Sequence, residues 1–263
     1  MPAIDSSLGD AIAEIAREAG QVALRRQSED FRRWEKTPGA PVCDVDLEID
    51  RLLHTRLTAL VPEAGWLSEE TLDNAERLTA NRLWVVDPID GTRDYVRGRP
   101  GWAVSIALIE AGQPVVGVLD APARGEHWRA DVGRGATRND VLLHVTPRNM
   151  LSGARVPTDQ LSKVDTDLVM VAKPNSIALR IAMVAAGEAD LLATLRWGHE
   201  WDIAAAVLIA REAGATVTDA LGAALDFNTP NAQAFGVLAT APGIHAAARE
   251  RLRERAEARV HLP

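Results

Sequence analysis

The residues best suited to chemistry lie at the end of one short apolar run, residues 83–86. Asp87 and Asp90 follow this run, with Pro88 between them and a Gly-Thr step behind. The run is rich in β-forming residues and predicts a strand that is buried on both faces. Two carboxylates on a stiff turn at a strand end offer oxygen ligands of the kind that Mg²⁺ binds. A plain turn closing a hairpin is the structural alternative for the same residues.

Gly91 and Thr92 extend the metal hypothesis to an anion. Gly91 lets another backbone or a ligand approach closely, because glycine has no Cβ. If a helix starts after Gly91, its first N–H groups face the two aspartates and favour a bound phosphate. Taken alone, residues 87–92 leave both the turn and the metal–phosphate site open.

The sequence Asp-Pro-Ile-Asp-Gly-Thr at residues 87–92 resembles the D-P-I/L-D-G-T motif of the inositol monophosphatase-like phosphatases. The members of that group are Mg²⁺-dependent and lithium-sensitive. They include inositol monophosphatase, the bacterial 3′-phosphoadenosine 5′-phosphate phosphatases, fructose-1,6-bisphosphatase and some histidinol phosphatases.

Three further segments strengthen the resemblance. Residues 42–46 resemble V-T/S-x-x-D, with Cys43 where the family has Thr or Ser, and residues 65–70 resemble G-x-x-x-E-E. Residues 201–205 resemble W-D-x-A-A, and the E-A-G-G that follows in the family has Ala215 in place of its second Gly. Lys36 resembles a lysine that precedes the first of these segments in many members. The resemblance therefore covers nearly the whole chain.

Each acidic residue in these segments also has a structural alternative. Asp46 and Asp202 lie near the starts of predicted helices, where aspartate often serves as an N-cap. Glu69 precedes a second glutamate, and such pairs usually face solvent. His199 and Glu200 are expected at the edge of the substrate or in structural roles, because the family does its chemistry without histidine. The order of the four motifs favours the metal interpretation.

The resemblance implies a complete catalytic site. Its metal ligands for two Mg²⁺, with a third and weaker ion at Asp46 left open, are Glu69, Asp87, the carbonyl of Ile89, Asp90 and Asp202. Its substrate-binding residues are Asp90, Gly91, Thr92 and Asp202, with the phosphate against the N–H groups of Gly91 and Thr92. A Thr92–Asp46 pair and Glu69 are implied as the catalytic residues that orient and deprotonate the attacking water.

The first half of the chain predicts an α+β unit over residues 1–145 that carries most of the metal ligands. Apolar residues at helical spacing predict helices over residues 8–23 and 46–60, and alternation predicts strands over 102–109 and 115–119. A third strand is predicted over residues 128–132. Residues 71–82 are polar and predict a mobile connector.

The second half, residues 146–263, alternates strand and helix and predicts an α/β unit that completes one catalytic unit with the first. Its predicted helices cover residues 176–186, 202–213 and 242–259. The resemblance implies the layered αβαβα sandwich of the inositol monophosphatase and fructose-1,6-bisphosphatase type.

Composition narrows the partners. The net charge of −8 argues against wrapping a nucleic acid polymer or an anionic membrane, so an anionic substrate needs a local positive centre such as bound metal. Cys43 is the only cysteine, which excludes an intrachain disulfide and fits a reducing cytoplasm. No apolar run approaches the roughly 20 residues of a membrane span. We expect a cytoplasmic homodimer acting on a small phosphorylated metabolite.

The predicted reaction is Mg²⁺-dependent hydrolysis of a phosphomonoester. Leu-Ser-Glu-Glu at residues 67–70 and Arg93 after the central motif favour 3′-phosphoadenosine 5′-phosphate or a related bisphosphate nucleotide as substrate. Inositol 1-phosphate, histidinol phosphate and fructose 1,6-bisphosphate are the alternatives. A catalytically weak protein that binds metal and a phosphorylated ligand as a regulator is an alternative of another class, against which the intact acidic residues and Thr92 argue.

Overall fold

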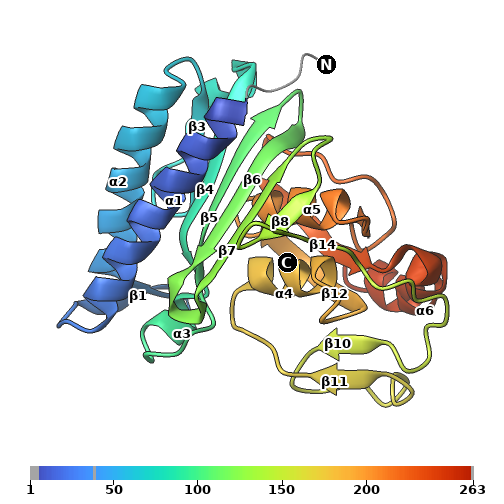
Figure 1. Ribbon diagram of the computed structural model, residues 1–263. Helices are drawn as coiled ribbons and strands as arrows, with labels where there is room; N and C mark the ends of the chain where they lie inside the picture. The colour runs from blue at the N-terminus through green and yellow to red at the C-terminus, as the bar shows by residue number, and fades with distance from the viewer. Residues whose placement is uncertain (1–5, 38–39, 262–263) are drawn as a thin grey trace.

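The computed structural model describes residues 6–37 and 40–261. It contains five alternating layers of helix and sheet (Figure 1). The outer pair α1 (Ser6–Gln27) and α2 (Asp44–Leu60) covers one face of a large sheet, and α4 (Ile177–Ala185) with α5 (Ala204–Glu212) covers the other. A smaller sheet and α6 (His245–Glu257) follow beyond α4 and α5. This arrangement confirms the αβαβα sandwich.

The large sheet has seven strands in the order β3-β4-β5-β6-β7-β8-β9. Only β3 and β4 run parallel among the neighbouring pairs of this sheet, and the remaining pairs are antiparallel. Its strands are β3 (Gly65–Ser68), β4 (Arg82–Asp90), β5 (Ala103–Glu110), β6 (Gln113–Ala121), β7 (Glu126–Asp131), β8 (Ala136–Arg138) and β9 (Val141–Leu142).

The second half contributes an antiparallel sheet in the order β12-β14-β13, with one parallel strand pair beside it. The sheet strands are β12 (Leu191–His199), β13 (Thr216–Thr218) and β14 (Gln233–Thr240), and the pair is β10 (Arg155–Pro157) with β11 (Val169–Val171). The remaining short elements among the described residues are β1 (Arg33–Thr37), β2 (Ala40–Cys43), α3 (Thr92–Tyr95) and three 3₁₀ turns, η1 (Ala75–Thr79), η2 (Pro122–Arg124) and η3 (Pro242–Ile244).

Strand β4 is buried on both faces, as its composition predicts. Trp84 and Val86 belong to the apolar cluster under α1 and α2, whereas Leu83 and Val85 belong to the cluster under α4 and α5. Because side chains alternate along a strand, a continuous apolar run is what two covered faces require. The central strand is thereby held rigidly up to the point where its aspartates begin.

Helix α5 approaches the sheet closely because small residues meet there. A Cβ built on Gly117 of β6 would lie 2.6 Å from the backbone oxygen of Ala205, a distance that side-chain carbons do not tolerate. Ala204, Ala205 and Ala206 are all buried at this contact. The glycine and the alanines together bring the start of α5, and the residues just before it, down onto the sheet.

The polar segment 71–82 departs from the prediction of a mobile connector. It contains η1, and Arg77 within it is only 3% exposed. The side chain of Arg77 bonds to the loop at residues 228–230. The prediction from polar composition is wrong here because the neighbouring residues in the sequence do not show whether an arginine is buried and hydrogen-bonded or exposed to solvent.

Within the part of the chain described, no helix is long and apolar enough to cross a membrane.

Candidate active site

Glu69 and Asp87 are neighbours because β3 and β4 are parallel. Ser68, the last residue of β3, lies opposite Val86 of β4, and the Glu69 N–H donates to the Val86 carbonyl at 3.3 Å. Both residues therefore leave the sheet at the same edge and at the same level. The carboxylates that the sequence separates by 18 positions share this edge as a direct result of strand pairing.

Asp202 joins them from the second half of the chain. The Ser105 hydroxyl donates to the Trp201 carbonyl at 3.5 Å, and Ser105 is the residue opposite Asp87 on β5. Helix α5 begins only at Ala204 with Ile203 at its N-cap, so the N-cap alternative for Asp202 is wrong. Its Oδ2 instead accepts from the His199 N–H at 3.3 Å.

Three carboxylates converge at this point. One oxygen from each of Asp87, Asp90 and Asp202 lies within 4.8 Å of the others. Burial, followed by repulsion from Glu69 and Asp90, raises the pKa of Asp87 well above its ordinary value. Burial and the charges of Asp90 and Glu69 raise the pKa of Asp202 in the same way. A hard divalent cation would relieve this repulsion, and the all-oxygen donor set fits Mg²⁺.

Asp90 also holds the second half of the chain to the first. Its carboxylate accepts from the Ser176 hydroxyl at 2.5 Å, from the Ala178 N–H at 2.8 Å and from the Ile177 N–H at 3.3 Å. These donors form the start of α4, where an acceptor is needed for the first N–H groups. Burial still raises the pKa of Asp90, although the three bonds oppose the rise.

Asp46 and Cys43 form the start of α2. Cys43 is the N-cap, and Asp46 Oδ2 accepts from both the N–H and the Sγ of Cys43 at 2.8 Å. Burial raises the pKa of the Cys43 thiol, so the S–H stays protonated and serves as a donor. Cysteine here supplies the hydrogen bond that a Thr or Ser hydroxyl would make. Thr92 Oγ1 lies 3.0 Å from the Ile89 carbonyl and 3.4 Å from Asp46 Oδ1.

Gly91 is required by the turn that joins β4 to α3. Its φ is +96°, and an added Cβ would lie 2.7 Å from the Gly101 carbonyl oxygen and 2.9 Å from the Ser176 nitrogen. A side chain at this position is therefore excluded both by conformation and by space. Helix α3 is only four residues long, so any anion bound here depends on individual N–H groups more than on a helix dipole.

A cleft of about 360 Å³ lies in front of the carboxylates. It is lined by Glu69, Asp87, Asp90, Gly91, Thr92, Arg93, Asn175, Ile177, Arg180, Arg196, His199, Trp201 and Asp202. All of the proposed ligand side chains lie here together with Gly91 and Thr92, and Asp46 lies behind Thr92. The Lys36 side chain lies outside the part of the chain that the structure describes.

The cleft also contains the cations Arg93, Arg180 and Arg196, of which Arg180 and Arg196 lie outside the four acidic motifs. Arg196 lies on β12 with an exposed side chain, and no ion-pair partner for it is found within residues 6–37 and 40–261. Arg180 donates to the carbonyls of Pro174 and Asn175, and burial lowers its pKa. A guanidinium nevertheless stays protonated at neutral pH. Arg93 lines the cleft, whereas Arg97 and Arg99 line a separate hollow beside it.

The residues before Asp202 divide into two roles. The His199 ring stacks on Trp201 at the cleft, with centroids 4.2 Å apart and planes 6° from parallel. Glu200 points away from the cleft and is fully buried, where it accepts from the N–H groups of Asn228 and Thr229. His199 therefore lies at the cleft edge, while Glu200 is structural.

Comparison with known proteins identifies relatives of this chain by sequence and by fold. The model of the inositol monophosphatase family matches residues 5–261. The chain is 36% identical to the Nus factor SuhB of Xylella fastidiosa over 81% of its length and 82% of the relative. It is 34% identical to a histidinol-phosphatase of Mycobacterium tuberculosis over 84% and 89% of the two chains. The solved structure of the Thermotoga maritima IMPase superimposes with a TM-score of 0.82 at 27% identity, covering 95% of this chain and 98% of that one.

Proposed function

Because this chain belongs to the inositol monophosphatase family and is a phosphomonoesterase, we propose that it uses Mg²⁺ to hydrolyse a small phosphate ester whose leaving group is itself anionic. 3′-Phosphoadenosine 5′-phosphate, or a related bisphosphate nucleotide, is the proposed substrate. The observation that carries the substrate class is the guanidinium of Arg196, exposed in the cleft without an ion-pair partner among the described residues.

The acidic cluster supports the metal part of the proposal. Glu69, Asp87, Asp90 and Asp202, with the Ile89 carbonyl, would hold two Mg²⁺, and Asp46 would complete a weaker third site. Bound Mg²⁺ would supply positive charge that stabilises the transition state and offsets the repulsion between an acidic protein and its anionic substrate.

The chain's own groups have separate roles in the proposed reaction. The N–H groups of Gly91 and Thr92 would orient the phosphate at the start of α3. Glu69 and the Thr92 hydroxyl would orient the attacking water, and Glu69 would take its proton. Asp46 would fix the Thr92 hydroxyl, to which it lies at 3.4 Å.

Both halves of the chain are proposed to form one catalytic unit, residues 1–145 and 146–263. Support comes from Asp90, whose carboxylate binds the start of α4, and from Asp202, which reaches the edge of the large sheet. Neither half alone carries the full set of carboxylates.

The charge of the leaving group divides the substrate candidates. A nucleoside 5′-phosphate and fructose 6-phosphate are anions, inositol is neutral, and histidinol carries a cationic amine. Arg196, assisted by Arg180, would attract the two anions and repel histidinol. A charged hydrogen bond contributes about 1.5–3 kcal/mol, which corresponds to a preference of roughly 10- to 150-fold.

A phosphate-release assay tests the proposal, with the four candidate esters compared in the presence and absence of Mg²⁺. We expect kcat/KM to be highest for the bisphosphate nucleotide and negligible after chelation. Arg196→Met should lower that kcat/KM by at least about tenfold and leave inositol 1-phosphate unchanged, since only the former ester offers a second anion. Equal losses on both esters would contradict the role of Arg196, and the absence of any hydrolysis would favour a regulatory protein.

A further inference from the structure

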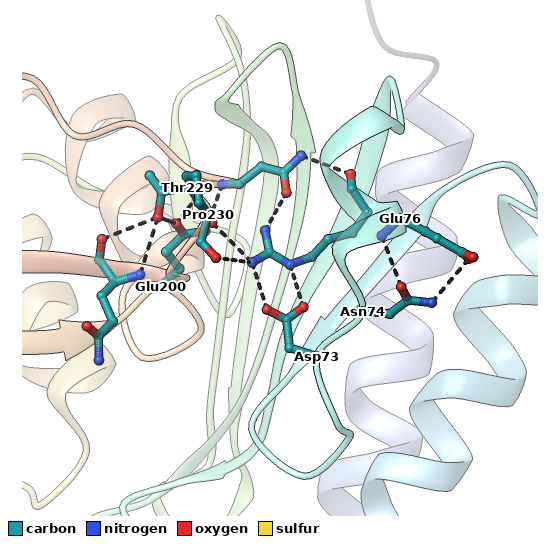
Figure 2. Close-up of polar contacts among 9 residues, drawn as sticks. Asp73, Asn74, Glu76, Glu200, Thr229 and Pro230 are labelled. Carbon is teal, nitrogen blue, oxygen red and sulfur yellow. Dashed lines mark hydrogen bonds and ion pairs between the residues drawn. The ribbon is translucent and has the colours of Figure 1, made fainter.

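Arg77 lies between the segment that follows Glu69 and the loop that precedes β14. Its side chain is only 1% exposed, although residues 71–82 are otherwise polar. Figure 2 shows the polar network around it, which runs from Asp73 on one side to Thr229, Pro230 and Glu200 on the other. The network thus connects two parts of the chain that are remote in sequence.

Each nitrogen of the Arg77 guanidinium donates at least one hydrogen bond. Nε and Nη2 form two bonds to Asp73, at 2.6 and 2.8 Å. Nη1 donates to Asn228 Oδ1 at 2.7 Å, and Nη2 also donates to the carbonyls of Thr229 at 3.0 Å and Pro230 at 3.4 Å. Asn228 returns a bond from Nδ2 to the Arg77 carbonyl at 3.1 Å. Such a planar set of contacts fixes both position and orientation.

Glu200 continues the network from the loop to Asp202. Its carboxylate, 0% exposed, accepts from the Asn228 N–H at 2.7 Å, the Thr229 N–H at 2.9 Å and the Thr229 hydroxyl at 2.5 Å. Its carbonyl accepts from the N–H groups of Ile203 and Ala204 at 3.2 and 2.9 Å. Glu200 therefore holds the turn in which Asp202 lies. The position of Glu200 itself depends on its bonds to the 228–230 loop.

The turn that carries Glu69 is fixed at both of its ends. Asp50 accepts from the hydroxyls of Ser68 at 2.5 Å and Thr71 at 2.7 Å, just before and after Glu69. Asp73, two residues beyond Thr71 in the same segment, is held by Arg77. The segment that carries Glu69 and the loop that supports the Asp202 turn are thus both bonded to Arg77.

We propose that Arg77 is a positioning residue for the metal site, which acts through the 228–230 loop and Glu200 to hold the Glu69 and Asp202 turns at the separation that a cation requires. The need for such a device follows from charge: the clustered carboxylates repel one another and tend to separate. This inference rests on the proposed function, because it assumes that the carboxylates bind Mg²⁺.

Two variants and one control test the role of Arg77. Arg77→Met removes the guanidinium and keeps the length of the side chain. Asn228→Gly removes only the amide that links Arg77 to the loop, and glycine readily adopts the Asn228 backbone with its φ of +65°. The control is Arg155→Met, because Arg155 likewise forms a two-bond ion pair with an aspartate, Asp190, and does not line the cleft.

Mg²⁺ affinity measured by titration calorimetry, with the thermal unfolding midpoint of the metal-free protein, is the readout. We expect the Mg²⁺ Kd to rise about 10- to 100-fold in Arg77→Met and by a smaller factor in Asn228→Gly, as for other partners of metal ligands. Arg155→Met should lower the unfolding midpoint and leave the Kd unchanged. Wild-type Mg²⁺ affinity in both test variants, or an equal loss of affinity in the control, would overturn the positioning role of Arg77 and leave the proposed function intact. A wild-type protein that binds no Mg²⁺ would overturn the proposed function as well.

Discussion

Single residues determine how much negative charge the site can hold. Asp87 is 1% exposed and Asp90 6% exposed, and both face Asp202. Carboxylates at such separations resist ionisation together unless a cation joins them. The same feature that makes the site suitable for Mg²⁺ therefore makes the metal-free protein less stable.

Asp87→Asn should separate stability from activity. Removal of one buried charge lowers repulsion, so the unfolding midpoint of the metal-free variant should rise, with each kcal/mol giving about 2–4 °C in a chain of this size. Turnover should fall by more than about a hundredfold, since even indirect partners of ligands cost 10- to 100-fold. Calorimetry in EDTA and phosphate release at saturating Mg²⁺ measure the two effects. Near-normal turnover would remove Asp87 from the ligand set.

Thr92→Ala tests the hydroxyl that lies 3.0 Å from the Ile89 carbonyl and 3.4 Å from Asp46. The variant keeps the backbone N–H and removes only the hydroxyl. If that group orients the attacking water, turnover should fall by about a hundredfold or more, while binding of Mg²⁺ and of a non-hydrolysable substrate analogue changes little. Single-turnover kinetics and equilibrium binding distinguish the two. Lost analogue binding with unchanged turnover of bound substrate would assign Thr92 to binding alone.

At the level of elements, the site depends on how tightly β4 turns into α3. Gly91 lies where the turn, the Gly101 loop and the start of α4 meet, with no space for a side chain. The parallel pairing of β3 and β4 then sets Glu69 beside this turn. The position of Glu69 relative to Asp87 is consequently set by the register of β3 against β4 more than by the flexibility of the side chains.

Gly91→Ala and Gly98→Ala form a matched pair that separates conformation from space. Both glycines have positive φ, +96° and +65°, but an added Cβ meets the Gly101 carbonyl at 2.7 Å only at Gly91 and meets nothing within 4 Å at Gly98. The left-handed conformation should cost each variant about 1–2 kcal/mol of unfolding free energy. Gly91→Ala should lose about 1–3 kcal/mol more through overpacking, together with most of its activity. Urea unfolding measures the difference, and equal losses in the two variants would show that the turn relaxes.

At the level of the whole molecule, the second half is anchored by a buried carboxylate, Asp190, and the groups that bond to it. Asp190 accepts from the backbone and side chain of Arg155 and from the Thr146 hydroxyl at 2.7 Å, while its carbonyl accepts from Ala241. These bonds attach β10 and the segment leading to it to the small sheet. The strand β12, which carries Arg196 and ends at His199, begins directly after Asp190.

Asp190 should make stability depend on acid pH. Despite burial, its bonds to Arg155 and Thr146 lower the pKa of Asp190 from 3.8 to about 2. A carboxylate whose folded pKa is depressed stabilises the protein above its unfolded pKa and loses this contribution as pH falls through the folded pKa. About 2 kcal/mol should therefore be lost between about pH 4 and pH 2. Asp190→Asn should flatten the unfolding free energy over that window, and an unchanged slope would exclude this linkage.

The sequence by itself determined what depends on neighbours along the chain. The apolar run of β4, the helical spacing of α1 and α2 and the alternation of β5 and β6 are local patterns, and each element appears within a few residues of its predicted bounds. The acidic motifs identify the carboxylates that gather in the cleft, Glu69, Asp87, Asp90 and Asp202. Each motif is a short run of residues in a fixed order, so it can be read from the sequence. Their separate roles in catalysis stay predictions.

Only the tertiary structure decided which polar side chains are buried and which cations face the cleft. Arg77 looks like an ordinary surface residue in the sequence, and the sequence leaves Glu200 between the substrate edge and a structural role. Both are buried because long-range loops close over them. Arg196 belongs to no motif, and it faces the carboxylates because β12 ends beside the edge of the large sheet. The physical reason is that burial and electrostatic surroundings are set by residues far away in the chain, whereas a local pattern reports only the residue's own preference.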